Sequence, residues 1–516
     1  MTPKVHPVVF SVSAMLTLVF VAVGAWYADN IGQIVERLQG FLVANVGWFY
    51  VLVVAFFLVF VLWLLISPYG ALRLGKQEER PEYTNTTWFA MLFSAGMGIG
   101  LLFFSVAEPV MHFTSPPGAD GATIDAAHEA MLLTFLHWGL HAWAIYIIIG
   151  LALAYFAYRH NLPLAIRSTL YPLLGHRING PIGNVVETVA VLGTIFGVAT
   201  SLGLGAMQIN AGLDYLGLLS ESTVSQLVLI ALITAAATVS VASGLDRGIR
   251  RLSQLNLGLG VALVLFVLIT GPTVFLASSF IESVGRYLQN IVALSLRTDA
   301  FFGTDWQADW TMFYWAWWIS WSPFVGMFIA RISRGRTVRE FIAGVLLVPT
   351  LLTFLWLTVF GNTALHIELF GDGGIAGAVA ESTPVALFAL LEQLPLSAIS
   401  ITMATLVIAT FFITSSDSGS LVIDILTSGG RRNRPVYQRV FWSLLQGGVA
   451  MVLLLAGGLL ALQTAVLTLA LPFSIVMLVI CYSLVKGLRT ERSDALAEPH
   501  AGSGLIKEPG EPVSGA

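Results

Sequence analysis

The chain has 516 residues, of which 57% are hydrophobic and only 10% are charged; its formal net charge is −4 and its mean hydropathy is +0.83. A soluble protein carries about 25% charged residues, so this composition predicts a membrane protein. The small negative charge gives no sign of a nucleic-acid partner. The single cysteine, Cys481, excludes a disulfide framework and a thiolate metal site.

Apolar runs of the length that a membrane helix needs, roughly 20 residues, recur along the whole chain. We count twelve of them and predict an all-α, polytopic membrane protein. Many runs follow the first one, so we expect a mature helix there rather than a cleaved signal peptide. The predicted membrane helices are Val8–Ala28, Trp48–Ile66, Trp88–Ala107, Ala130–Tyr155, Gly183–Leu204, Leu227–Ala242, Leu255–Phe280, Trp310–Ala330, Phe341–Leu365, Leu396–Thr414, Val440–Leu460 and Thr464–Val485.

Positive charge indicates which loops face the cytoplasm, because cytoplasmic loops carry the excess of Lys and Arg. Of the 25 Lys and Arg residues, only Arg37, Arg286 and Arg297 fall in loops that the twelve-helix topology places outside. The long stretch 361–395, which this topology also places outside, has no Lys or Arg. We therefore expect both termini to lie in the cytoplasm.

The segments between the predicted spans leave no room for a soluble domain. Segment 281–309 predicts an amphipathic helix on the outer surface, and segment 486–516, rich in Pro and Gly, predicts a disordered cytoplasmic tail. No glycine-rich phosphate loop is present, so ATP does not drive the protein directly. His137 and His141 share an i,i+4 spacing, but no third metal ligand lies near them in the sequence. By elimination, we expect a secondary transporter that is not an enzyme and holds no cofactor.

The third predicted helix contains the stretch Ser94–Gly100 (SAGMGIG), with glycine at three alternate positions. Each glycine costs about 1 kcal/mol relative to alanine inside a helix. Close helix packing is one explanation, because Gly96 and Gly100 have the GxxxG spacing. Alternating glycine also favours local unwinding, which frees carbonyl groups for an ion or a substrate. We favour unwinding, because interrupted membrane helices mark binding sites in transporters.

The eighth predicted helix contains four Trp within seven residues, in the segment Tyr314–Phe324. No charged residue lies between Asp309 and Arg331. A wall of indole rings in the middle of a span suits a cation that cannot donate hydrogen bonds, since cation–π attraction replaces its lost water. An interfacial aromatic belt is the alternative, and it fits only Trp306 and Trp310 at the helix start.

Pro323 in the same helix cannot donate to the carbonyl of Ile319, so this span also looks interrupted. The two interrupted helices open two successive five-helix blocks, residues 88–280 and 310–485. Because five is odd, the second block enters the membrane from the opposite side, as in an inverted repeat. Residues 1–87 then hold the cytoplasmic N-terminal tail and two additional helices.

The tenth predicted helix ends in a run of hydroxyl residues, Thr414–Ser420. Thr414 and Ser415 could complete an oxygen cage for Na⁺ together with carbonyls freed in the third helix. Serine and threonine hydroxyls also bond back to their own helix, and this alternative stays open.

Several motifs together resemble the betaine/carnitine/choline transporter (BCCT) family. The resemblance covers almost the whole membrane region and implies a LeuT-like five-plus-five inverted repeat, a homotrimer, and uptake of quaternary ammonium osmolytes across the bacterial cytoplasmic (inner) membrane, where lipid surrounds the protein. Its anchors are Ala95–Gly100, Glu108–Pro109, His137–His141 with Trp143 and Tyr146, Ser201–Gly205, Tyr314–Gly326, Ala330–Arg336 and Thr414–Ser420.

The resemblance also implies the residues of a substrate site. An aromatic box falls on Trp138, Trp143, Tyr146 and Trp318. Trp317 and Trp321 are expected to line the inward part of the pathway, and Trp315 matches a further Trp of the motif. Met97, Gly98 and Gly100 of the unwound stretch complete the predicted substrate contacts.

Na⁺ is the coupling ion that the resemblance implies, in one site and in a doubtful second one. The first site would use the carbonyls of Ser94, Met97 and Phe411 and the hydroxyls of Thr414 and Ser415. The second would use Thr194 and Phe324. One turn after Thr194, sodium-coupled betaine carriers have Thr, whereas this chain has Val198, which lacks the oxygen ligand.

The charge at one position favours a particular substrate. Choline carriers of the family tend to have Asp where this chain has Gly100, and a fixed anion suits a substrate that lacks its own carboxylate. We therefore expect a zwitterion, glycine betaine, taken up with Na⁺. The alternative is choline (or carnitine, ectoine or dimethylsulfoniopropionate), with a proton gradient as the driving force, because Phe104–Val110 also resembles choline carriers.

Overall fold

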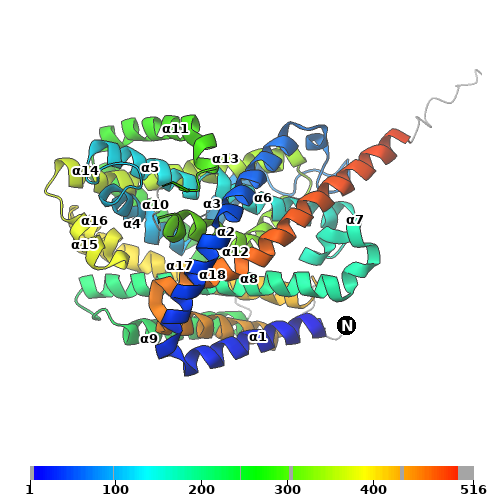
Figure 1. Ribbon diagram of the computed structural model, residues 1–516, viewed down its shortest axis with the longest axis horizontal. Coiled ribbons are helices and arrows are strands. Elements are labelled where there is room, and N and C mark those ends of the chain that lie inside the picture. The colour runs from blue at the N-terminus through cyan, green and yellow to red at the C-terminus, as the bar shows by residue number, and fades with distance from the viewer. Residues whose placement is uncertain (1–4, 97, 244–245, 302–305, 431–434, 498–516) are drawn as a thin grey trace, which may run out of the picture.

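The computed structural model describes residues 5–96, 98–243, 246–301, 306–430 and 435–497 (Figure 1). Within these ranges the chain is helical, and its only β-type contact is an isolated bridge between Arg73 and Thr337. Nine helices of the described residues are long and apolar enough to cross a membrane, and one bent pair adds a tenth if it forms one span. The predicted all-α, polytopic membrane protein is confirmed; the count of twelve spans and the inverted repeat stay predictions.

Eighteen α-helices make up the described chain, and several continue into short 3₁₀ or π segments. Three π segments, 155–159, 308–312 and 358–362, directly adjoin α6, α12 and α13. The α-helices are α1 (Pro7–Trp26), α2 (Ala28–Ile66), α3 (Asn85–Gly96), α4 (Ile99–Thr114), α5 (Ile124–Trp138), α6 (Leu140–Ala154), α7 (Tyr171–Leu174), α8 (Pro181–Tyr215), α9 (Thr223–Ser243), α10 (Asp246–Thr270), α11 (Thr273–Ser295), α12 (Phe313–Ile332), α13 (Val338–Leu357), α14 (Thr363–Phe370), α15 (Ile375–Glu381), α16 (Ala386–Glu392), α17 (Ser397–Thr427) and α18 (Val436–Ala497).

The last two predicted membrane helices both lie in α18, which is not one regular helix. Gly457 and Gly458 have non-helical backbone angles, with φ of 164° and 58°. A positive φ near 58° is a conformation that glycine adopts without the strain of a Cβ atom. The glycine pair therefore divides α18 near the end of the predicted run Val440–Leu460, a few residues before the run Thr464–Val485 begins.

The seventh predicted helix ends earlier than expected. The run Leu255–Phe280 is broken after Thr270, because Pro272 has no N–H to continue α10, and the chain restarts as α11 at Thr273. The amphipathic helix predicted for segment 281–309 therefore begins eight residues earlier and ends at Ser295. Its buried residues are Leu276, Ser283, Tyr287 and Leu294, while Ile281 and Val292 are exposed, and its place on the outer surface stays a prediction.

Two predicted helix ends are wrong in the second half of the chain. The tenth predicted helix was expected to end at Thr414, but α17 continues to Thr427. The predicted disordered tail 486–516 is helical as far as Ala497, and its remainder lies outside the described residues. Glu491 stabilises this extension, because its carboxylate binds the guanidinium of Arg159 and accepts a hydrogen bond from Tyr155 at 2.7 Å.

Burial separates inner helices from lipid-facing ones. In the most apolar window of the segments 124–159 and 181–215, which include α5, α6 and α8, 89% of residues are buried inside the protein. In α1, α9 and α10 that share is only 22% to 28%, so their apolar side chains face outward, where lipid would cover them. Helix α12 is buried on nearly all sides and packs against α6, α8 and α18.

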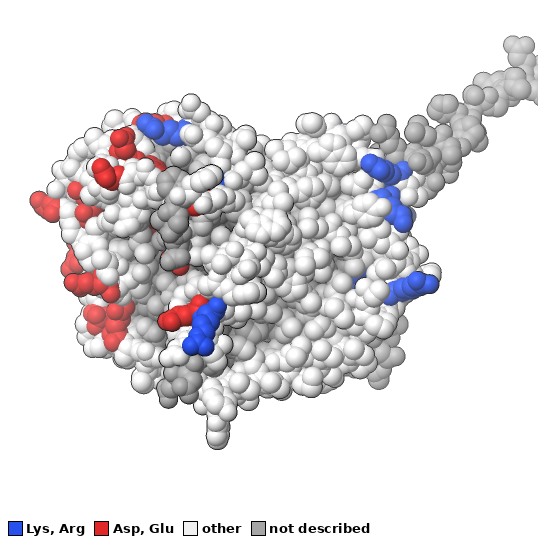
Figure 2. Space-filling view, viewed as in Figure 1, with Lys and Arg blue, Asp and Glu red and all other residues white. Residues whose placement is uncertain are grey.

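Charged side chains gather at the two ends of the molecule (Figure 2). Acidic side chains cluster at the end formed by α4, α5 and α14 to α16, and most Lys and Arg on this face lie at the opposite end, near the N-terminus of the chain. The separation of charge runs along the direction of the long helices. It is the pattern that the positive-inside argument expects, while the orientation in the membrane stays a prediction.

Candidate substrate site

The glycine stretch of the third predicted helix does interrupt the span. Helix α3 ends at Gly96 and α4 begins at Ile99, and their axes are bent by 66°. Gly98 precedes α4 in an extended conformation, so the first N–H groups of α4 have no partner within the helix. Met97 lies outside the described residues. The interruption leaves a helix N-terminus, which carries partial positive charge, in the protein interior.

The second predicted interruption is wrong. Helix α12 runs unbroken from Phe313 to Ile332 with Pro323 inside it. The carbonyl of Ile319, which Pro323 cannot satisfy, accepts a hydrogen bond of 2.7 Å from the Ser322 hydroxyl. A neighbouring side chain thus replaces the missing backbone donor and keeps the helix intact.

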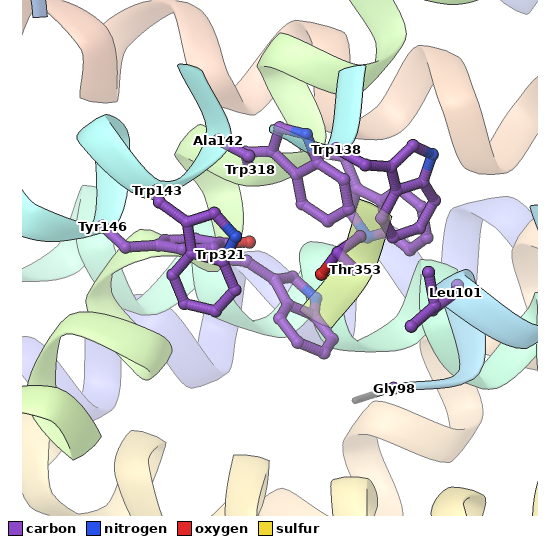
Figure 3. A pocket seen from close by; sticks show the side chains of 11 residues that line it. Gly98, Leu101, Trp138, Ala142, Trp143, Tyr146, Trp318, Trp321 and Thr353 are labelled. Carbon is purple, nitrogen blue, oxygen red and sulfur yellow. The ribbon is translucent and has the colours of Figure 1, made fainter. Parts of the chain in front are cut away.

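A small cavity of about 40 Å³ lies between the N-terminus of α4 and the aromatic faces of α5, α6 and α12 (Figure 3). Six of its lining residues are aromatic, and Figure 3 shows several of their rings turned toward one another around it. The residues that line it are Gly98, Gly100, Leu101, Trp138, Ala142, Trp143, Tyr146, Trp317, Trp318, Trp321 and Thr353. We call this the aromatic cavity.

The rings of the aromatic cavity meet mostly edge to face. Trp138 and Tyr146 each pack against Trp318 with centroids 5.0 Å and 6.2 Å apart, and Trp143 packs against Tyr146 at 5.5 Å. The interplanar angles of these pairs lie between 68° and 75°. Trp317 stacks on Trp318 with an angle of 11°. Rings at such angles can present π faces from several directions, which is how aromatic cages bind quaternary ammonium groups.

Three indole N–H groups around the aromatic cavity donate to acceptors in the surrounding helices and not into the cavity. Trp318 donates to the carbonyl of His137 at 2.9 Å, and Trp317 donates to the carbonyl of Gly197 at 3.4 Å. Trp138 donates to the carboxylate of Glu108 at 2.7 Å. In contrast, the indole nitrogen of Trp321 is buried and has no hydrogen-bond partner among the described residues.

Gly100 is required by the packing of the aromatic cavity. A Cβ atom at this position would lie 2.4 Å from Cη2 of Trp317, far inside van der Waals contact. The sequence suggested that glycine here leaves out a negative charge. The structure adds that glycine allows α4 to approach the Trp317 ring.

One predicted substrate residue lies elsewhere, and three lining residues were not predicted. Trp315 is absent from the cavity lining and instead stacks on the His141 ring at 5.3 Å, on another face of α12. Leu101, Ala142 and Thr353 line the cavity. Leu101 and Ala142 adjoin predicted residues in sequence, whereas nothing in the sequence marks Thr353.

A larger cavity of about 330 Å³ lies beside the aromatic cavity, and Trp321 lines both. We call it the polar cavity. It brings together four of the five residues predicted for the first Na⁺ site, and the fifth, Met97, is not described. Phe324 of the doubtful second site also lines it, as do Asn256 and Arg331. The four predicted residues that line it are Ser94, Phe411, Thr414 and Ser415.

Some of the oxygen atoms that line the polar cavity are suitable ligands for a hard cation. Hydroxyl and carbonyl oxygens are the ligands that such ions prefer. The hydroxyl of Thr414 donates to the carbonyls of Thr410 and Phe411, at 3.0 Å and 3.1 Å, so it bonds back to its own helix. Its oxygen also accepts a hydrogen bond from the Asn256 amide at 3.5 Å, which leaves one lone pair for an ion. The guanidinium of Arg331 lines the same cavity and adds positive charge.

The second predicted Na⁺ site stays a prediction, and its Thr194 lies outside both cavities. Thr194 is fully buried in α8, its hydroxyl donates to the carbonyl of Ala190 at 2.8 Å, and it lines neither cavity. Val198 is 1% exposed and lies against α17, where a Cβ atom on Gly419 would meet its methyl groups at 3.1 Å. The structure does not bring Thr194 together with Phe324 around a cavity.

The structure is that of a polytopic helical membrane protein with an aromatic cavity between its helices. This arrangement is typical of transporters. The model of the betaine/carnitine/choline family transporters matches residues 8–493. The chain therefore belongs to the betaine/carnitine/choline transporter family, and it is a transporter rather than an enzyme.

Curated relatives match over almost the whole chain. A glycine betaine transporter of Acinetobacter baylyi is 47% identical, over 98% of this chain and 77% of the relative. The glycine betaine transporter OpuD of Bacillus subtilis is 46% identical, over 94% of this chain and 95% of the relative. The high-affinity choline transport protein of Escherichia coli is 44% identical, over 95% of this chain and 73% of the relative.

Proposed function

We propose that this protein takes up a quaternary ammonium compatible solute, glycine betaine, by alternating access, coupled to an inward Na⁺ gradient. The observation that carries the proposal is the aromatic cavity. Trp138, Trp143, Tyr146 and Trp318 surround a space from which the indole N–H groups of Trp138 and Trp318 are turned away. A trimethylammonium group cannot donate hydrogen bonds, so ring faces suit it better than polar groups do. The names of two relatives agree with this substrate.

Two features near the cavity support a zwitterion in place of a simple cation. No acidic side chain lines the aromatic cavity, so the substrate meets no directly contacting anion. The N–H of Trp321 has no partner among the described residues, and the N-terminus of α4 at Gly98 faces the same space. Both would favour a carboxylate group carried by the substrate itself.

Na⁺ coupling is supported by the polar cavity. Ser94 belongs to α3, whereas Thr414 and Ser415 belong to α17, so an ion held between them would link two helices. An ion gradient drives the substrate only if ion and substrate favour the same conformational state. Trp321 lines both cavities and offers a physical contact through which the two sites would influence each other.

Choline is the second candidate, with a proton gradient as the driving force. The observation that favours it is Glu108, a fully buried acidic residue that accepts the hydrogen bond of Trp138. A choline transporter is also among the relatives. Carnitine, ectoine and dimethylsulfoniopropionate share the onium or zwitterionic chemistry and belong in the same comparison.

Uptake by proteoliposomes tests these alternatives. Labelled glycine betaine and labelled choline are offered separately, with and without an inward Na⁺ gradient and with a proton gradient alone. Unlabelled betaine, choline, carnitine and ectoine serve as competitors. Accumulation of betaine against its gradient only when Na⁺ is present supports the proposal. Accumulation of choline with a proton gradient alone would instead establish the second candidate.

We also propose that the protein serves osmoprotection and is a homotrimer in the bacterial cytoplasmic membrane, with both termini in the cytoplasm. The distribution of charge over the two ends of the molecule supports this orientation (Figure 2). Protease cleavage of a tag on the N-terminus in inside-out vesicles, but not in right-side-out cells, tests the orientation. Native mass spectrometry of the purified protein tests the trimer.

A further inference from the structure

The carboxylate of Glu108 is surrounded by donor groups. Glu108 lies in α4 and is completely buried. One of its oxygens accepts hydrogen bonds from the indole of Trp138 at 2.7 Å and the hydroxyl of Tyr314 at 2.5 Å. The other oxygen lies 2.6 Å from Nδ1 of His137 and 3.4 Å from Nε2 of His112. Trp138, Tyr314 and His137 lie within hydrogen-bond distance of the carboxylate, whereas Nε2 of His112 is near it but has no hydrogen-bond partner among the described residues.

The tautomer of His112 argues for an anion and against a metal ion here. The indole of Trp306 can only donate, and it approaches Nδ1 of His112 at 3.3 Å. In the neutral ring the proton is therefore on Nε2, the nitrogen that faces Glu108, and no lone pair remains there for a metal. His137 adds a further donor to the carboxylate when its proton is on Nδ1, the nitrogen 2.6 Å from Glu108. Trp138 and Tyr314 donate to the other oxygen, and such hydrogen bonds favour the charged form of a carboxyl group.

This cluster holds the wall of the aromatic cavity. Trp138 lines the cavity with its ring and binds Glu108 with its N–H group. Trp318 donates to the carbonyl of His137, the residue whose ring contacts the same carboxylate. Tyr314 packs 5.7 Å from Trp318 while its hydroxyl binds Glu108. The carboxylate thus lies one indole ring away from the substrate space.

We propose that Glu108 is a specificity-determining positioning residue: a buried anion, one ring behind the cavity, that strengthens the binding of a cation through Trp138. A negative charge at the indole N–H increases the electron density of the ring face, and its own field reaches the cavity with little screening. The inference rests on the proposed quaternary ammonium substrate and deepens it. A simple cation gains the whole attraction, whereas the carboxylate of a zwitterion offsets part of it.

The test compares a charged ligand with a neutral one of the same shape. The ligands are choline, glycine betaine, and the carbon isostere of choline in which a tert-butyl group replaces the trimethylammonium group. Glu108→Gln removes the charge, and its amide oxygen can still accept from Trp138 and Tyr314. Its amide nitrogen can donate to Nδ1 of His137, whose other nitrogen then donates to Thr311. Dissociation constants are measured by tryptophan fluorescence on the purified full-length chain.

We expect Glu108→Gln to weaken choline binding about tenfold or more, the size expected for losing one charge near a desolvated cation. The binding of glycine betaine should weaken less. The binding of the neutral isostere should weaken by less than about twofold, because it has no charge that the carboxylate attracts. Glu187→Gln is the matched control. Glu187 is equally buried, is paired with Arg167 and does not line the aromatic cavity. Glu187→Gln should therefore leave the dissociation constants of all three ligands unchanged.

Each outcome has one reading. Equal weakening of choline and its neutral isostere would overturn the inference, because Glu108 would then only maintain the shape of the cavity. If Glu108→Gln does not fold, Trp138→Phe keeps a ring in the wall but removes the N–H that binds the carboxylate. It should weaken choline more than the isostere, and equal effects would again overturn the inference. A wild-type protein that binds neither choline nor glycine betaine would refute the proposed function instead.

Discussion

The aromatic cavity and the polar cavity share Trp321 but differ in what satisfies their polar groups. Around the aromatic cavity, Trp138, Trp317 and Trp318 direct their N–H groups into the surrounding helices, so that ring faces remain toward the space. Around the polar cavity, a few hydroxyl and amide groups line part of a mostly apolar space, and the hydroxyl of Thr414 bonds to its own helix and accepts from Asn256.

The difference suggests a division of labour between the two cavities. A cavity of ring faces selects an organic cation and offers nothing to Na⁺, which requires oxygen ligands. The oxygens that line part of the polar cavity have the reverse preference. Substitutions in the first should change substrate affinity at any Na⁺ concentration, and substitutions in the second should change the dependence on Na⁺. The following predictions test this separation.

The largest effect is expected at Trp318, because its ring contacts Trp138, Tyr146 and Trp317. Trp318→Ala, and Trp143→Ala with it, should weaken substrate binding by ~1–2 kcal/mol or more, the range for a desolvated cation–π contact. That is about fivefold to thirtyfold in the dissociation constant, with the same ratio at low and high Na⁺. Equilibrium binding of labelled betaine measures it.

The control for this prediction should be an exposed tryptophan. Trp306, expected to be an interfacial anchor, is unsuitable because it donates to His112 beside Glu108 and lies under the guanidinium of Arg297. Trp26 is 83% exposed and contacts neither cavity. Trp26→Ala should leave binding unchanged. Normal binding by a folded Trp318→Ala variant would remove the aromatic cavity from consideration as the substrate site.

A smaller but more selective effect is expected at Thr414. Thr414→Ala removes a hydroxyl oxygen from the polar cavity and should abolish the stimulation of uptake by Na⁺, while weak uptake without Na⁺ remains. In the wild-type protein we expect a Hill coefficient for Na⁺ of about one rather than two, since Val198 lacks the oxygen ligand of the second predicted site. Initial uptake rates over a series of Na⁺ concentrations measure both quantities.

Thr402→Ala is the matched control for Thr414→Ala. Thr402 lies on the same helix, α17, and its hydroxyl makes the same kind of back-bond, to the carbonyl of Ala398 at 2.7 Å, but it is exposed. Its loss should not alter the response to Na⁺. If Thr414→Ala and Thr402→Ala respond to Na⁺ equally, the polar cavity does not hold the coupling ion.

The aromatic wall was easier to predict from sequence than its neighbours, and the reasons are physical. Glycine and tryptophan have strong local consequences: the run around Gly98 cannot favour a regular helix, and clustered indoles in a span need a partner. The interruption predicted at Pro323 was wrong because the neighbouring Ser322 supplies the missing hydrogen bond. A serine next to a proline in an apolar helix is a signal that could have corrected the prediction.

Contacts between distant helices were beyond the reach of the sequence. Thr353 lines the aromatic cavity because α13 packs against α6, and Trp315 leaves it because its face of α12 meets His141. Helical periodicity groups residues into faces but does not say which neighbour each face meets. Glu108 was recognised as part of a motif, yet its four surrounding groups come from α4, α5 and α12, which only the fold brings together.

Gly100 sharpens the comparison within the aromatic cavity itself, because charge and packing both explain a glycine there. A Cβ atom at Gly100 would lie 2.4 Å from Trp317. Overpacking should therefore lower the free energy of unfolding of Gly100→Ala and Gly100→Asp by about 1–3 kcal/mol, and both variants should show reduced uptake. The two variants share the Cβ atom and differ in charge. Only Gly100→Asp should raise choline uptake relative to betaine uptake. An equal ratio in both variants would show that the charge at this position does not select the substrate.

The smallest effect is expected at Val198, one turn after Thr194 of the second predicted Na⁺ site. Val198→Thr is nearly isosteric and places a hydroxyl one turn after Thr194, where it can donate to the carbonyl of Thr194 and keep its lone pairs for an ion.

The Hill coefficient for Na⁺ should then rise from about one toward two, with little change in betaine affinity at saturating Na⁺, because the aromatic cavity is untouched. The control is Val186→Thr, since Val186 is also buried in α8 and, like Val198, lines neither cavity, but it precedes Thr194 by two turns. Both variants bury a new hydroxyl group and should therefore have a lower melting temperature. If the melting temperature falls but the Hill coefficient of Val198→Thr does not change, Thr194 does not help to bind a second ion. Coupling to a single Na⁺ at the polar cavity would then remain the proposal.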